Sequence, residues 1–155
     1  MKKTKYLFVD FDGVMHRNGH KAFEFAEYFG KVITSMKEVD IRIVFSTSWR
    51  EYSTVERLAN YLPKNIHHLC VGKTPLITDS VPHPRFKEIM MYNNEHGIND
   101  QDWVALDDMA CLFPPNCPNL ILIDGSKGLT KADARKLRKM FVYENQITEN
   151  KSLKP

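Results

Sequence analysis

Two observations predict an α/β fold for this chain of 155 residues. Short runs of apolar and β-branched residues alternate with longer segments in which apolar residues recur at the helical period. Such alternation predicts a parallel sheet that is covered by helices on both faces. Acidic or hydroxyl residues also follow three of the runs, and open parallel sheets bind ligands at the carboxyl ends of their strands. We therefore expect a Rossmann-like, three-layer α/β/α sandwich around a mostly parallel five-stranded sheet.

The first strand is expected at residues 6–9, where the run Tyr-Leu-Phe-Val precedes Asp10. The chain must turn at the end of this strand, and Gly13 permits a turn that other residues resist. Later runs rich in β-branched, aliphatic and aromatic residues predict the other strands at residues 41–45, 66–71, 103–106 and 120–123.

Helices are expected between the strands, at residues 22–39, 51–62, 85–96 and 130–144. Pro63 ends the second helix and Gly97 the third, because proline breaks a helix and glycine favours its C-terminal cap. The polar residues 15–21 predict a loop or small hairpin flap, and residues 72–84, with three prolines, predict a loop. The length suits one domain, expected at residues 1–145, with a frayed tail at residues 146–155.

Charge and cysteine usage restrict the classes to which the protein can belong. A formal net charge of +3 does not require nucleic acid, but it is compatible with a polyanionic partner. Three cysteines without a paired spacing predict reduced thiols and a cytoplasmic location. The apolar run before Asp10 is too short for a signal peptide, and nothing approaches a membrane span, so no membrane partner is expected.

The polar groups after the strands are of matched kinds. Two carboxylates at one strand end repel each other, and a bound divalent cation relieves that repulsion. Independent surface turns have no reason to place acids and hydroxyls at three different strand ends, so the pattern favours a functional site. The residues are Asp10 with Asp12, the cluster Ser46, Thr47 and Ser48, and Asp107 with Asp108.

These groups suit the hydrolysis of a phosphate ester. A magnesium ion held by carboxylates polarises the phosphoryl group, and an aspartate can attack phosphorus to form an acyl phosphate. A second carboxylate can give a proton to the leaving oxygen and later remove one from water. A hydroxyl and a cation would hold the remaining phosphoryl oxygens.

The same motifs resemble those of haloacid dehalogenase (HAD) superfamily phosphatases. Residues 10–14, Asp-Phe-Asp-Gly-Val, match the D-x-D-G-[VT] loop of this superfamily, and residues 46–48 match its second motif. Residues 106–108, Leu-Asp-Asp, match the acidic fourth motif, so the resemblance covers residues from about 4 to 140. Ser-Trp-Arg at 48–50, with Gly-Leu-Thr at 128–130, resembles a small branch of stand-alone HAD domains related to RNA-repair phosphatases.

The resemblance implies a phosphoric monoester hydrolase that uses Mg²⁺. Asp10 would be the nucleophile and Asp12 the general acid and base. Thr47 would bind the phosphoryl group, with Ser46 and Ser48 as alternatives because the end of the strand is uncertain by one residue. The metal would be held by Asp10, the backbone carbonyl of Asp12, Asp107 and Asp108.

The cation of the third motif stays open among three residues. Lys87 has the expected residue type and is taken as the catalytic cation, whereas Arg85 fits the RNA-repair branch better. Both lie at a helix start, where the helix dipole also favours anions. Lys73 is the third candidate. Arg50 is expected to bind the substrate phosphate as a fork-shaped donor.

Two further residues and the substrate remain open. His16 either contacts substrate or belongs to the flap, and Trp49 either lines the site or packs under the loop. The segments before and after the second motif are too short for an inserted cap domain, so an open site is expected. Such a site suits a nucleic-acid end or a nucleotide. The alternatives are a small-metabolite phosphatase closed by oligomerisation and a non-catalytic module that binds phosphate or a partner.

Overall fold

The computed structural model describes residues 1–144 and contains one sheet of five strands. All neighbouring strands are parallel, and their order is β3-β2-β1-β4-β5. The predicted α/β fold with its five-stranded, parallel sheet is therefore confirmed. The strands are β1 (Thr4–Val9), β2 (Asp40–Phe45), β3 (Cys70–Lys73), β4 (Trp103–Asp107) and β5 (Leu120–Leu122).

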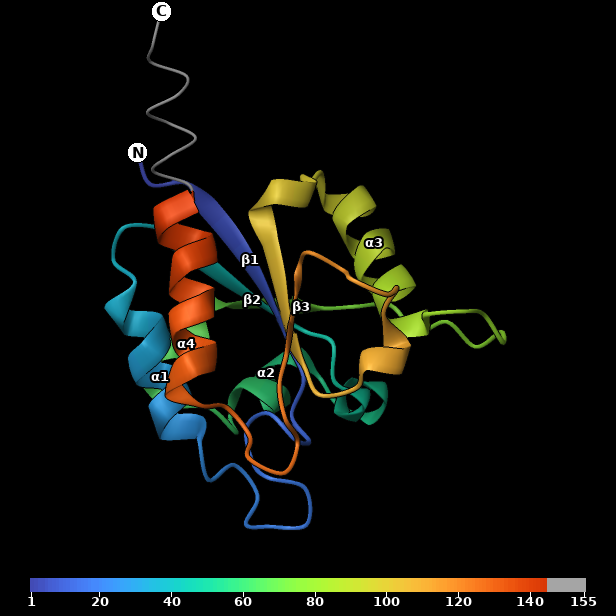
Figure 1. Cartoon of the computed structure of the whole chain (residues 1–155), viewed down its shortest axis with the longest axis horizontal. Coiled ribbons are helices and arrows are strands. Elements are labelled where there is room, and N and C mark those ends of the chain that lie inside the picture. The colour runs from blue at the N-terminus through green and yellow to red at the C-terminus, as the bar shows by residue number, and fades with distance from the viewer. Residues whose placement is uncertain (145–155) are drawn as a thin grey trace, which may run out of the picture.

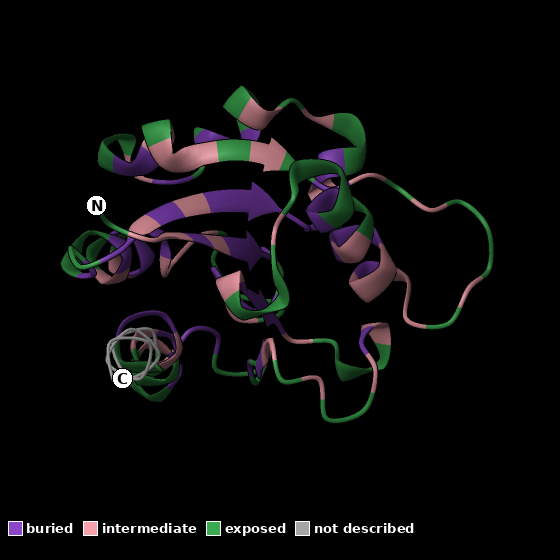
Figure 2. Cartoon of the chain, turned by 90° about the horizontal axis from the view of Figure 1, so that it is seen from above, coloured by how far each residue is buried: buried purple, intermediate pink, exposed green. Residues whose placement is uncertain are grey.

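Helices cover both faces of this sheet (Figure 1). Helices α1 (Ala26–Ser35), α2 (Val55–Ala59) and α4 (Lys131–Arg138) contribute to one apolar cluster, which includes Leu7 and Val9 of β1. Helix α3 (Pro84–His96) packs in a second cluster, which includes Phe8. The alternation of neighbouring β1 side chains between the two clusters is the two-residue period of a strand buried on both faces. Figure 2 shows this burial along the central strands.

The third strand begins later than the sequence pattern indicates. Residues 66–71 were expected to be extended, but Lys64–Leu69 form a 3₁₀ helix and β3 starts at Cys70. The Ile66 N–H donates to the Pro63 carbonyl at 3.1 Å, which closes a turn. The His67 ring is 2.7 Å from the Leu62 carbonyl and holds the same turn. An apolar residue that is buried from a turn gives the same sequence signal as one in a strand, which explains the wrong boundary.

Two predicted helices are also shorter than expected. In place of one helix at 51–62, the chain forms a 3₁₀ helix (Ser48–Tyr52) and then α2, and each begins after a hydroxyl cap. Thr47 accepts the Trp49 N–H, and Thr54 accepts the Arg57 N–H. Helix α1 begins at Ala26 and not at residue 22, since Phe23 has a positive φ of 58° and lies outside the helix.

The last predicted helix, 130–144, is present as α4 followed by a π-helical turn (Lys139–Tyr143). Thr130 and Asp133 form a reciprocal capping box at its start. The expected division into a domain at residues 1–145 and a frayed tail at 146–155 stays a prediction, because the tail lies outside the described residues. Within the described residues, no helix is long and apolar enough to cross a membrane.

The topology brings the carboxyl ends of β1, β2 and β4 together at one edge of the sheet. Strand β1 lies between β2 and β4, with Val9 opposite Phe45 on one side and Leu106 on the other. The next residue of each strand segment therefore belongs to the same edge. The flap that follows β1 lies beyond this edge, below the sheet in Figure 1, and the described chain inserts no separate cap there.

Candidate active site

Three carboxylates from β1 and β4 meet at this edge. Asp10 is 4 % exposed and Asp107 is 0 % exposed, and the Asp10 N–H donates to the Leu106 carbonyl at 3.1 Å. Asp10, Asp107 and Asp108 each present an oxygen atom, and these atoms lie within 4.8 Å of one another. Carboxylate oxygens are the ligands that Mg²⁺ prefers, so this cluster suits a magnesium ion.

Two glycines leave room for the third of these carboxylates. A Cβ atom on Gly13 would lie 2.2 Å from the Asp108 Oδ2 atom, and one on Gly125 would lie 2.7 Å from the same atom. Gly13 also has a φ of 77°, which only glycine adopts readily. The amide of Asn18 donates to Asp108 Oδ2 at 3.2 Å. The local backbone thus permits the Asp108 carboxylate to sit beside the loop that carries Asp10.

Arg85, in the first turn of α3, lies against the buried carboxylates. Its Nη1 atom is 2.8 Å from Asp107 Oδ2 and 3.4 Å from Asp10 Oδ2. The Arg85 Nε atom is buried and has no hydrogen-bond partner among the described residues. This guanidinium holds the two carboxylates near each other and keeps a donor for a further anion.

Burial and mutual repulsion perturb these acids. In the metal-free protein, burial, followed by the charge of Asp107, raises the pKa of Asp10 to about 8, although Arg85 opposes the shift. Burial likewise raises the pKa of Asp107, again against the effect of Arg85. One guanidinium therefore does not compensate for all the carboxylates, and a divalent cation would supply the missing positive charge.

The carboxylate of Asp12 is held by two ring donors. Its side chain is 55 % exposed, the His16 Nε2 atom lies 2.9 Å from Oδ1, and the Trp49 Nε1–H donates to Oδ2 at 2.9 Å. The Phe23 backbone N–H donates to His16 Nδ1 at 3.1 Å. Because that backbone group can only donate, Nδ1 is the bare nitrogen and Nε2–H donates to Asp12. The orientation of Asp12 is thus fixed at both oxygens.

The three hydroxyl residues after β2 differ in their surroundings. Ser46 is 1 % exposed, its N–H donates to the Val9 carbonyl at 3.1 Å, and its Oγ atom has no partner among the described residues. Thr47 is fully buried, and its Oγ1 atom accepts the Trp49 N–H at 3.3 Å as a helix cap. Ser48 is exposed. The buried Ser46 hydroxyl is thus free to bind a phosphoryl oxygen, and the Thr47 hydroxyl keeps its O–H as a second possible donor.

Residues 6–134 match the protein family described as the HAD domain in Swiss Army Knife RNA repair proteins. The match spans most of the chain and includes all of the site residues above. The chain belongs to this HAD domain family. No curated protein matches the sequence.

In this HAD domain, Arg50 is placed differently from the expectation. Four of its five N–H groups donate to groups inside the protein. Its guanidinium, 3 % exposed at the side chain, also pairs with Glu88 of α3 at 2.8 Å. The other acceptors are backbone carbonyls, those of Ser46, Thr47, Thr74 and Pro75. Arg50 therefore holds the loops around the site together, and these contacts do not support its expected role as a phosphate ligand.

Of the three candidate cations, the described contacts bring Arg85 to the acids. The Lys73 amine donates to the carbonyls of Arg50 and Ser53, at 3.2 and 2.9 Å. Lys87 follows Arg85 by two positions on α3, which turns its side chain about 200° around the helix axis from that of Arg85. The Lys87 backbone N–H donates to the His83 carbonyl, but no hydrogen bond or ion pair of its side chain is seen within the described residues. The choice of Lys87 as the third-motif cation thus lacks support from the geometry.

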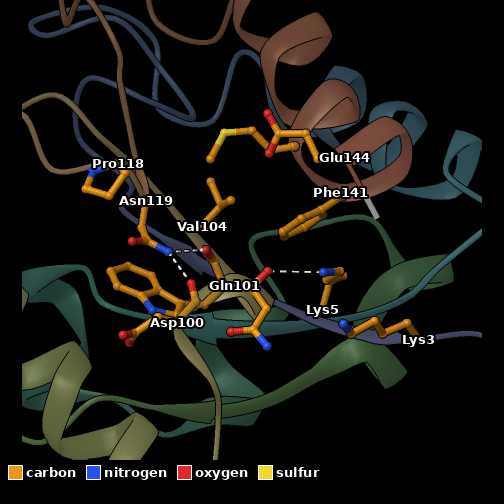
Figure 3. Close-up of a pocket in the computed structure, with 11 residues that line it drawn as sticks. Lys3, Lys5, Asp100, Gln101, Val104, Pro118, Asn119, Phe141 and Glu144 are labelled. Carbon is orange, nitrogen blue, oxygen red and sulfur yellow. Dashed lines mark hydrogen bonds between the residues drawn. The ribbon is translucent and has the colours of Figure 1, made fainter. Parts of the chain in front are cut away.

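A hollow of about 560 Å³ lies at the opposite edge of the sheet, near the starts of β1 and β4. Figure 3 shows Lys3 and Lys5 beside Gln101, with Val104 and Phe141 on the same cavity. Lys5 donates to the Gln101 carbonyl at 3.1 Å, and both lysines pair with Asp102. Because this hollow lies at the amino ends of the strands, it is separate from the carboxylate cluster.

Proposed function

We propose that this HAD domain is a Mg²⁺-dependent phosphomonoesterase that forms an aspartyl-phosphate intermediate. The observation that carries the proposal is the convergence of Asp10, Asp107 and Asp108 within 4.8 Å, with Asp12 in the loop beside them. A bound Mg²⁺ would offset charge on the phosphoryl group and on these acids. Asp10, Asp107 and Asp108 are its proposed ligands, together with the Asp12 backbone carbonyl.

In the first step, a carboxylate oxygen of Asp10 forms a bond to phosphorus, and the bond from phosphorus to the ester oxygen breaks. That oxygen takes a proton from the Asp12 carboxyl group. In the second step, Asp12 removes a proton from water, whose oxygen attacks phosphorus and releases Asp10. The hydrogen bonds from His16 and Trp49 hold Asp12 in place, so we assign these two as positioning residues.

Two groups are proposed to hold the phosphoryl oxygens. The first is the Ser46 hydroxyl, which is buried and unpartnered within the described residues. The second is the Nε–H of Arg85, which is also unpartnered there and can donate to a phosphoryl oxygen. Thr47 stays an alternative, because its hydroxyl accepts the Trp49 N–H and still has its own O–H to donate.

We propose a nucleic-acid end or a nucleotide as the substrate. The site has no inserted cap within the described residues, so a bulky substrate can reach it. The family description, which names RNA repair proteins, favours the same class. A cytoplasmic location stays part of the proposal and is supported by three free cysteines.

A phosphatase panel tests this proposal. It would contain 5′- and 3′-phosphorylated oligonucleotides, free nucleotides and sugar phosphates, each with Mg²⁺ or with a chelator. We expect Mg²⁺-dependent release of phosphate that is abolished in Asp10→Asn, with Lys87→Met as the matched control that keeps activity. Turnover confined to small metabolites would instead favour the small-metabolite alternative. Mg²⁺ binding without turnover of any ester would support the non-catalytic module.

A further inference from the structure

Aromatic rings from three segments gather beside Asp12. The rings of Phe23 and Tyr61 are stacked, with centroids 4.5 Å apart and planes 12° apart. The Trp49 ring is 5.3 Å from each of them, at 83° to Phe23 and 86° to Tyr61. A ring that is equally distant from both members of a stack lies beside the stack and not on its end. Trp49 therefore leaves the outer faces of the stacked pair uncovered.

No second ring is stacked on the outer face of Tyr61 among the described residues. The Phe11 ring is 5.0 Å from Phe23 and 6.1 Å from Tyr61, both at steep angles, so it also contacts the stack from the side. Phe23 covers one face of Tyr61, yet Tyr61 is 45 % exposed. Tyr61 thus offers partly exposed aromatic surface that is backed by the Phe23 ring.

Phe23, whose ring is stacked on Tyr61, is held in place by a hydrogen bond to His16 of the active site. Phe23 has a φ of 58°, an unusual backbone conformation for a residue other than glycine. Its N–H donates to His16 Nδ1, and the opposite nitrogen of His16 contacts Asp12. The stack is therefore connected to the proposed general acid through a histidine on one side and through Trp49 on the other.

The position of the stack relative to Asp12 indicates what reaches it. The general acid gives its proton to the oxygen of the leaving group, so the organic part of the substrate must lie on the Asp12 side of the phosphoryl group. The Trp49 ring contacts Tyr61, and its Nε1 atom lies 2.9 Å from Asp12 Oδ2. The leaving group therefore departs on the side of the site where Trp49 links Asp12 to Tyr61.

We propose that the outer face of Tyr61 is a stacking subsite for the nucleobase of the nucleotide that carries the reacting phosphate. The inference rests on the proposed function and adds a specificity residue to it. Every nucleobase has a flat π-face, so stacking would select nucleotide esters over sugar phosphates without selecting one base. The exposed Tyr61 ring binds the base, while Asp10 and Asp12 act on the phosphate.

Two oligonucleotides of one sequence test the subsite. Each carries the same terminal phosphate, but one has a normal terminal nucleotide and the other an abasic residue. Binding is measured in the Asp10→Asn background, where turnover does not interfere, and KM in the active enzyme. We expect Tyr61→Leu to weaken binding of the normal end by about 5-fold to 100-fold. Binding of the abasic end should change less than about 2-fold, since no base is present to stack.

Matched variants separate stacking from general surface effects. Tyr61→Phe keeps the ring and should bind both ends like the parent. Tyr52→Leu removes a tyrosine that is 90 % exposed and makes no ring contact within the described residues, so it should also have no effect. Equal binding of the two ends by the parent, or an equal effect of Tyr61→Leu on both, would overturn the subsite. If the subsite is overturned but Mg²⁺-dependent turnover persists, the phosphatase proposal stands. Base-selective binding without any turnover would refute the phosphatase proposal and leave the stacking subsite intact.

Discussion

The stability of the metal-free protein should fall as the pH rises, and Mg²⁺ should reverse the loss. Asp10 is almost completely buried, and its pKa is raised from 3.8 to about 8, first by burial and then by Asp107. In the unfolded chain this carboxyl group ionises near its ordinary pKa, so between about pH 4 and pH 8 the folded state binds more protons than the unfolded state. Stability that is present at low pH is therefore lost across this window.

The size of the effect follows from the shift. Each pKa unit corresponds to about 1.4 kcal/mol, so a shift of about four units sets an upper limit of roughly 6 kcal/mol. Structural relaxation and entry of water reduce such penalties, and we expect a loss of about 2–4 kcal/mol in the free energy of unfolding. For a chain of this length, that loss lowers Tm by about 5–15 °C.

Thermal unfolding in chelator and in Mg²⁺, followed by circular dichroism from pH 5 to pH 8, measures both effects. At about one hundred times its Kd, Mg²⁺ should restore about 2.7 kcal/mol at the upper pH. Asp10→Asn removes the titrating group. The stability of this variant in chelator should therefore depend less on pH, and the dependence that remains should come from histidines. Asp108→Asn should keep a falling profile but lose most of the gain from Mg²⁺. If chelated wild type and Asp10→Asn gave the same profile, the reasoning from burial would be refuted.

Two further predictions concern the residues that support the site. Arg50→Met leaves Glu88 buried without its partner and should lower the free energy of unfolding by about 3–5 kcal/mol in urea denaturation. Lys87→Met, the control on the same helix as Glu88, should change the free energy of unfolding by less than about 0.5 kcal/mol. Equal effects of Arg50→Met and Lys87→Met would contradict the stabilising role of Arg50. His16→Ala should lower kcat by about 10-fold or more, because Asp12 loses one of its two donors. This loss should be larger for an alkyl phosphate, whose leaving oxygen needs the proton, than for a nitrophenyl phosphate; an equal loss would indicate a purely structural role.

The sequence predicted that acidic residues after two strands meet at one edge of the sheet. Asp10 follows a buried run, as does Asp107, and parallel strands bring such residues to one edge whatever the details of packing. The same reasoning could not choose between Ser46 and Thr47. That choice depends on a one-residue difference in where β2 ends and on which hydroxyl caps the next turn, and both are set by tertiary contacts.

The roles of the basic residues needed the three-dimensional structure for a different reason. Arg50 and Arg85 look alike in the sequence, because each lies near an expected helix start. Arg50 donates to the carbonyls of Thr74 and Pro75, which are more than twenty positions away in the sequence. No sequence pattern shows that these carbonyls point toward Arg50. Arg85 reaches Asp107 from the first turn of α3, a contact between elements that are far apart in the sequence. Local periodicity defines a helix but not its docking.

The most direct test of the account is whether Asp10 itself becomes phosphorylated. The enzyme with Mg²⁺ and a phosphorylated oligonucleotide would be quenched in acid during turnover, digested and examined by mass spectrometry. We expect one phosphoryl group on the peptide that contains Asp10, labile to hydroxylamine as an acyl phosphate is, and no such group in Asp10→Asn. Rapid turnover by Asp10→Asn, or a phosphoryl group on another residue, would contradict the proposed chemistry.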